Sequence, residues 1–150
     1  MIRYTVNNRN TFLSIPWYVT ALTVADNSCN DNNIGVVDLS SFKFLRSVVI
    51  GNYCFQYVQI LSIVGLNWLE SVSIGTYCFG RDGSLLVGSE FKIVNCPQLK
   101  RLSMGDLSFG RYNEYELSQL PQLVYISLSY NCNFGYNFPY SNAVFRGMND

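Results

Sequence analysis

Apolar residues recur along this chain in a fixed pattern, apolar-x-x-apolar-x-apolar. The pattern is present as Val19/Leu22/Val24, Leu45/Val48/Ile50, Leu69/Val72/Ile74, Leu99/Leu102/Met104 and Leu123/Ile126/Leu128. The last two apolar positions of each copy are two residues apart, which is the period of a strand with one buried face. Glycine follows three of the copies (Gly51, Gly75 and Gly105), where a small residue suits a tight bend. We therefore predict a short strand at each copy.

A second alternating segment ends just before each following copy. Its apolar positions are Val37/Leu39/Phe42, Leu61/Ile63/Leu66, Phe91/Ile93/Cys96, Tyr115/Leu117/Leu120 and Ala143/Phe145/Met148. Pro97 and Pro121 stand at the turns that come next, where a fixed φ and a missing N–H are tolerated. No segment has a convincing helical period. Each repeat is therefore predicted to supply two short strands.

These two segments divide the chain into repeats. The repeats are residues 19–44, 45–68, 69–98, 99–122 and 123–150, which is 24 to 30 residues each. Self-similarity at a period of 20–50 residues indicates stacked repeats. We predict a repeat solenoid, a β-rich coil with parallel ladders on two faces and neighbouring repeats about 4.8 Å apart. Residues 19–150 would form this single solenoid, and residues 1–18 a degenerate N-terminal half-repeat or cap.

The repeats resemble the leucine-rich repeat superfamily. Its Leu-x-x-Leu-x-Leu core is present as Leu45-x-x-Val48-x-Ile50 and in the matching residues of the next two repeats. The Gly-x-x-(Cys/Ser)-Phe that follows is similar to the Ile-Gly-x-x-Ala-Phe stretch of the BspA-like subgroup. The resemblance covers residues 19–150. It implies a protein-interaction or adhesion module that binds through a face of strands and has no catalytic residues at these positions.

Composition narrows the class of partner. Only 13% of the 150 residues are charged, and ten Lys and Arg balance ten Asp and Glu. No basic stripe exists for nucleic acid, so a nucleic-acid partner is not expected, and the expected protein partner is what the resemblance to leucine-rich repeats implies. No apolar run approaches the ~20 residues of a membrane span, so membrane insertion is not expected. The start of the chain lacks an apolar signal region and the sequence has no Asn-x-Ser/Thr sequon, which favours an intracellular location. A surface location is the alternative if the chain is a fragment.

The side chains that usually carry chemistry are sparse. The chain has no histidine, and its five cysteines are not spaced as zinc ligands, so no metal or cofactor is expected. Residues 31–35 resemble part of a calcium loop, but Phe42 stands where the closing acidic residue is needed. The carboxylates are scattered and form no obvious pair. We expect no enzymatic activity.

Two of the cysteines, Cys54 and Cys78, occupy the same position in adjacent repeats, a position that Ser28, Ser108 and Cys132 hold elsewhere. Their backbones would lie near 5 Å apart, within the range of a disulfide. Exchange with serine favours a ladder of buried, inert thiols. A disulfide or a reactive pair is the alternative.

Candidate partner-binding residues lie on and beside the outward-facing side of the first strands: Arg46, Glu70, Lys100, Arg101 and Tyr125. The functional interpretation is a binding face with Tyr125 as an aromatic anchor. The alternative is a charge ladder of alternating sign that keeps the face soluble, with each pair worth less than about 1 kcal/mol.

Differences in repeat length fall between the two strands, at Asn30–Val36, Gly80–Glu90 and Phe134–Asn142. Loops in corresponding positions of a solenoid emerge from one side. This edge is a second candidate recognition surface, and the candidate residues on it are Arg81, Asp82, Tyr136 and Tyr140. Neutral drift in tolerant loops is the alternative.

Three functions remain as hypotheses. The chain is a non-enzymatic scaffold that binds a protein, a cell-surface adhesion module that presents loops, or a self-assembling structural solenoid. The fifth repeat reaches Asp150 with no polar capping segment, which predicts either a longer array or end-to-end self-association.

Overall fold

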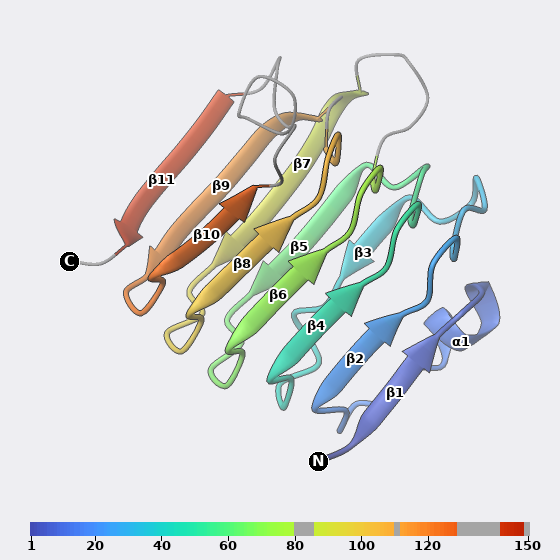
Figure 1. Ribbon diagram of the computed structural model, residues 1–150, viewed down its shortest axis with the longest axis horizontal. Helices are drawn as coiled ribbons and strands as arrows, with labels where there is room; N and C mark the ends of the chain where they lie inside the picture. Colours follow the sequence, from blue (N-terminus) through green and yellow to red (C-terminus); the bar gives the residue numbers. More distant parts are fainter. Residues whose placement is uncertain (80–85, 110–111, 129–141, 149–150) are drawn as a thin grey trace.

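The computed structural model describes residues 1–79, 86–109, 112–128 and 142–148. Its strands form two sheets, and all neighbouring strands within them are parallel (Figure 1). The first sheet has the order β1-β2-β4-β6-β8-β10, and the second has the order β11-β9-β7-β5-β3. From β2 to β11 the chain alternates between the sheets, so neighbouring strands come from successive repeats. The prediction of a β-rich chain with parallel strands in two sheets is confirmed.

The strands of the first sheet are β1 (Arg3–Val6), β2 (Ala21–Val24), β4 (Ser47–Ile50), β6 (Ser71–Ile74), β8 (Arg101–Met104) and β10 (Tyr125–Leu128). They pair residue for residue, so that Leu22, Val48, Val72, Leu102 and Ile126 form one row across the sheet. The first four side chains of that row are buried, as the alternating pattern requires.

The strands of the second sheet are β3 (Val36–Asp38), β5 (Ile60–Val64), β7 (Leu86–Val94), β9 (Tyr112–Leu120) and β11 (Asn142–Met148). Two of them are longer than the predicted short strands, because β7 and β9 have nine residues each. Residues 86–90, predicted as part of a loop, belong to β7. Its pairing with β9 shifts between Leu86 and Glu90, where Gly88 has a left-handed φ of 82°.

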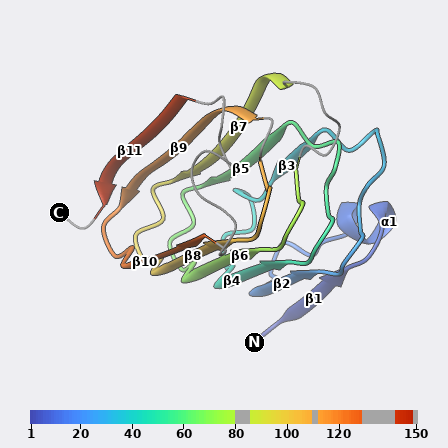
Figure 2. The same ribbon diagram turned by 45° about the horizontal axis from the view of Figure 1, so that its top comes forward.

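Residues 1–18 add a strand and a short helix. Strand β1 extends the first sheet by pairing with β2 from Arg3↔Ala21 onward. Helix α1 (Arg9–Leu13) is capped by Asn8, whose side chain accepts a hydrogen bond from the Thr11 N–H. Figure 2 shows the sheets as two layers, with α1 at the end of the stack marked by β1. No helix was predicted, and a five-residue helix is too short to have a readable period.

Phenylalanine rings stack between the two sheets. Phe55, Phe79 and Phe109 come from successive repeats, and their ring centroids are 5.4 and 4.6 Å apart. In the first repeat Cys29 stands at this position, and Phe12 of α1 instead packs edge-on against Phe55 at 5.7 Å. The helix therefore supplies the ring that the first repeat lacks.

The strand ends of the first sheet approach one another closely. A Cβ atom on Gly51 would lie 2.4 Å from Asp26 Oδ1, and one on Gly75 would lie 2.4 Å from Asn52 Oδ1. Those oxygens accept hydrogen bonds from the N–H groups of Asn52 (2.8 Å) and Thr76 (2.9 Å) in the next repeat. Glycine is needed here because the backbone and the side-chain oxygen of the preceding repeat fill the space.

Candidate binding surface

The outer face of the first sheet, meaning the side turned away from the second sheet, consists of two rows of side chains. One row is Arg3, Ala21, Ser47, Ser71, Arg101 and Tyr125. The other row is Thr5, Thr23, Val49, Ser73, Ser103 and Ser127. At the centre of the face the side chains are small, mostly serine and threonine hydroxyls with Val49 among them, and the large ones, Arg3, Arg101 and Tyr125, occur towards the ends. A partner could therefore approach the strand backbones closely at the centre.

Three predicted residues, Arg46, Glu70 and Lys100, stand just before strands β4, β6 and β8. The Glu70 N–H donates to the Arg46 carbonyl at 2.8 Å, and the Lys100 N–H donates to the Glu70 carbonyl at 2.9 Å. The three residues are therefore neighbours along the sheet edge, and all are exposed. Within the described ranges the single ion pair is Lys92–Glu90 on β7, so these three charges alternate in sign without forming close ion pairs. They remain open to solvent.

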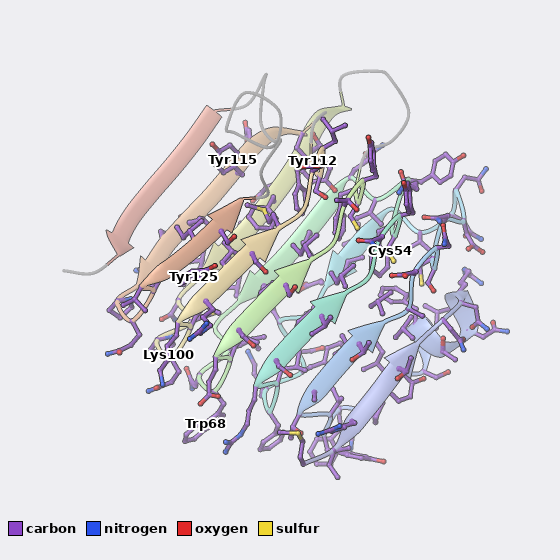
Figure 3. All side chains as sticks on the ribbon, viewed as in Figure 1. Cys54, Trp68, Lys100, Tyr112, Tyr115 and Tyr125 are labelled. Carbon is purple, nitrogen blue, oxygen red and sulfur yellow. The ribbon has the colours of Figure 1, made fainter. Side chains whose placement is uncertain are left out.

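The other two predicted residues, Arg101 and Tyr125, lie side by side on β8 and β10. The Arg101 guanidinium carbon is 5.6 Å from the centre of the Tyr125 ring, which is a cation–π distance. The Tyr125 side chain is 49% exposed, so half of its surface is open to a ligand. Figure 3 labels Tyr125 and Lys100 in the part of the first sheet nearest the C-terminus. The structure thus brings Lys100, Arg101 and Tyr125 together at one end of the face.

The remaining four candidates belong to the predicted loops between the two strands of a repeat. Arg81, Asp82, Tyr136 and Tyr140 lie outside the described residues. Of the three predicted loops, the one that begins at Asn30 is described, and its last residue, Val36, already belongs to β3. The buried side chain of Ile34 anchors this loop to the core.

The described cysteines are free and buried. The thiols of Cys54 and Cys78 donate to the carbonyls of Ala25 and Gly51, both at 3.0 Å. Ser108 repeats the contact with its hydroxyl, which donates to the Gly75 carbonyl at 2.7 Å. The position thus serves as a hydrogen-bond donor to the strand end one repeat earlier, and the ladder interpretation describes it better than a disulfide.

Burial also suppresses the ionisation of two of these thiols, Cys29 and Cys96. Desolvation is the main reason that the pKa of Cys29 rises to about 12, and the nearby Cys54 and Asp31 add to it. Desolvation likewise raises the pKa of Cys96. Neutral thiols are poor nucleophiles, so neither is suited to chemistry at neutral pH.

The sequence interpretation missed a group of carboxylates on the outer side of the second sheet. Glu90 and Glu114 are direct neighbours in the register of β7 and β9, and Lys92 is the neighbour of Glu116. Lys92 also lies 3.2 Å from Glu90. The bulge at Gly88 sets this register, and the repeat lengths alone could not predict it.

A second feature that the sequence interpretation missed is a set of exposed aromatic side chains at the turns that lead into β2, β4 and β6. Trp17, Tyr18, Phe44 and Trp68 are 47 to 68% exposed. These residues immediately precede the strand pattern in three successive repeats, so aligning the repeats one or two positions earlier would have found them.

Within the described residues, no helix is long and apolar enough to cross a membrane. The same residues contain no cluster of three or more side chains placed to hold a metal ion. Comparisons with protein-family models, with curated proteins and with solved structures gave no match.

Proposed function

We propose that this chain is a leucine-rich-repeat-like solenoid that acts as a non-enzymatic scaffold and binds a protein partner through the outer face of its first sheet. The observation that carries the proposal is the exposed Arg101–Tyr125 pair beside the unpaired charge of Lys100. Tyrosine and arginine are among the side chains most enriched at energetically important contacts of protein interfaces. The small hydroxyl side chains next to them leave room for a partner to pack closely.

The distribution of charge favours a protein rather than a polyanion as the partner. Arg46, Glu70 and Lys100 alternate in sign along the edge of the face, and the chain as a whole carries equal numbers of positive and negative side chains. Alternating charges give an interface its register and discriminate between partners, whereas a polyanion needs a positive surface. The partner surface is expected to carry an acidic group facing Arg101.

Affinity capture from extract of the source cells tests this proposal. The bait is the full chain, and the variants are Arg101→Glu and Tyr125→Ala. Both remove exposed side chains and should leave the fold intact. Tyr57→Ala is the matched control, because Tyr57 is 47% exposed and lies outside the outer face.

A specific partner should be captured by the wild-type chain and by Tyr57→Ala, and lost from both face variants. With that partner purified, we expect Tyr125→Ala to weaken binding by about tenfold or more, since truncating such an anchor costs about 2 kcal/mol. Equal affinity of the wild-type chain and both face variants would show that the face is not the binding site.

Self-assembly is a second candidate, supported by exposed apolar side chains in β10 and just before it. Val124 is 76% exposed, and Ile126 is 44% exposed although it continues the buried row of Leu102. Sedimentation velocity over a hundredfold range of concentration would detect it. If the chain assembles, Val124→Asp should shift it to the monomer; a wild-type monomer at every concentration rules self-assembly out.

A further inference from the structure

The aromatic row consists of Trp17, Tyr18, Phe44 and Trp68. The Trp17 and Tyr18 ring centroids are 5.3 Å apart, and those of Trp17 and Phe44 are 5.9 Å apart. Figure 3 shows Trp68 at the turn that enters β6, projecting away from both sheets. The row is separate from the outer face of the first sheet, because its residues belong to the turns that precede β2, β4 and β6.

The repeated turn explains why these rings are exposed. The Val19 N–H donates to the Pro16 carbonyl at 3.2 Å, and the Leu45 N–H donates to the Phe42 carbonyl at 3.1 Å. Each hydrogen bond closes a four-residue turn, and its two central residues face solvent. Burying Val19 and Leu45 therefore leaves the ring just before each of them outside.

Hydrogen-bonding side chains continue the row. The position held by Tyr18, Phe44 and Trp68 is held by Gln98 and Gln122 in the next two repeats, and both are exposed. None of these five side chains is charged. A strip of aromatic rings followed by neutral amides suits a ligand that has apolar C–H faces and many hydroxyl groups, which is the chemistry of a neutral sugar.

The spacing along the aromatic row favours an extended chain of sugars rather than a peptide as the ligand. The backbone positions of Tyr18, Phe44 and Trp68 advance by one repeat, about 4.8 Å, at each step. A polyproline helix rises about 3.1 Å per residue and a β-strand about 3.3 Å, so neither sets one residue on each ring. A β-1,4-linked pyranose chain advances by close to one repeat per sugar and can set one sugar on each ring.

Ring orientation selects a single chain over a crystalline surface. The Trp17 ring is tilted by 89° from Tyr18 and by 57° from Phe44. Rings at these angles cannot form the flat platform that a crystal face needs. A single chain can rotate about its glycosidic bonds and follow them.

We propose that the aromatic row binds a neutral, extended β-1,4-linked glycan as a single soluble chain. The sugars stack on Tyr18, Phe44 and Trp68, and Trp17 packs from the side. The amides of Gln98 and Gln122 hydrogen-bond the hydroxyls of the sugars that follow. This site is distinct from the proposed protein-binding face, and both can be occupied in one molecule.

Intrinsic fluorescence tests the proposal directly, because the two tryptophans of the chain are both in the row. The full chain is titrated separately with cellohexaose, with chitohexaose, with an oligogalacturonate as the charged glycan and with a decaproline peptide. We expect a saturable change in tryptophan emission with one or both neutral glycans and none with the others. Trp68→Ala should weaken that binding about tenfold or more, measured by calorimetry, as expected when a stacking ring is lost.

Trp68→Tyr keeps a ring and should recover most of the affinity, whereas Tyr57→Ala, outside the row, should bind as the wild type does. Tyr125→Ala separates this site from the proposed protein-binding face, and it should leave glycan affinity unchanged. No saturable response to either neutral glycan overturns the proposal. A response to decaproline alone assigns the row to a proline-rich protein segment instead, and a response to the oligogalacturonate alone overturns the requirement for a neutral sugar.

Discussion

Glycine at the ends of the first-sheet strands determines how closely neighbouring repeats can stack. At Gly75 a Cβ atom would lie 2.4 Å from Asn52 Oδ1 and 2.7 Å from the carbonyl carbon and oxygen of Gly51. The backbone on that side cannot rotate away, unlike a flexible side chain. This position is therefore constrained by space more than by backbone conformation.

Gly75→Ala should lower the free energy of unfolding by about 2 kcal/mol or more, the scale of overpacking in a well-packed core. Urea unfolding followed by circular dichroism measures it. Gly35→Ala is the matched control, because nothing lies within 4 Å of a Cβ atom there. It should be neutral or slightly stabilising, since alanine restricts the unfolded chain. Equal stability of the two variants would contradict the close approach of Gly75 to Gly51.

The buried thiol of Cys29 makes stability fall at alkaline pH. The pKa of Cys29 is about 12 in the folded chain and 9.0 when unperturbed. Between these values the unfolded chain releases the thiol proton and the folded chain keeps it. The contribution of this group is therefore complete below pH 9 and is lost as pH rises towards 12.

Urea unfolding at pH 8, 9.5 and 10.5 should show a steady decrease in the free energy of unfolding. Cys29→Ala should make the decrease smaller, although Cys96, whose pKa is also raised, keeps part of it. Identical pH profiles for the two proteins would mean that Cys29 ionises equally easily in the folded state.

At the scale of elements, strand β9 is tied to a distant repeat by one side chain. Tyr112 at the start of β9 is fully buried, and its hydroxyl donates to the Val58 carbonyl at 2.6 Å. Its ring packs edge-on against Phe109 at 5.0 Å. Tyr112 and Val58 belong to the fourth and second repeats, so this contact passes over the third.

Tyr112→Phe should keep the ring contacts and leave the Val58 carbonyl without its partner. A buried carbonyl without a hydrogen bond costs about 1 to 2 kcal/mol, which thermal and urea unfolding can resolve. Tyr57→Phe removes the same hydroxyl from an exposed ring and should change stability by less than about 0.5 kcal/mol. If Tyr112→Phe changes stability as little as Tyr57→Phe does, water replaces the hydroxyl as the partner of the Val58 carbonyl.

The elements differ in how well the sequence predicts them. The first-sheet strands follow from the apolar pattern, because its alternation fixes which side chains face the core. Helix α1 could not be predicted, because its role depends on Phe12 meeting Phe55 in space, far along the chain. The neighbours Glu90 and Glu114 could not be predicted either, because the bulge at Gly88 decides their register.

The candidate surfaces also divide into one that the sequence predicted and one that it did not. Arg101 and Tyr125 were predicted together because they hold equivalent positions in neighbouring repeats, and their contact follows from that register. The aromatic row was missed although its positions align in the repeats. The sequence interpretation followed the apolar positions that are expected to face the core. An exposed ring is not one of these positions, so it was not considered.

At the scale of the whole molecule, the phenylalanine stack is the feature that links the repeats. Phe79 lies between Phe55 and Phe109, and all three are buried. In this part of the chain the rings of neighbouring repeats touch directly. Removing the middle ring therefore disturbs the repeats on both sides.

Phe79→Ala should cost about 3 to 5 kcal/mol, the usual range for truncating a buried phenylalanine. Phe44→Ala, at a ring that is 47% exposed, should cost less than about 0.5 kcal/mol. Native-state hydrogen exchange should show lost protection of the amides of β4, β6 and β8 in Phe79→Ala. A loss confined to β6 would mean that the repeats unfold independently of the stack.

The parallel pairing within each sheet also determines how the molecule responds to mechanical load. The first and last strands, β1 and β11, lie at opposite ends of the two sheets, and neighbours in each sheet are joined by hydrogen bonds (Figure 1). Tension applied to the termini therefore acts on one strand boundary at a time. The chain should lengthen in steps, as single strands are released in turn from the edges of the two sheets.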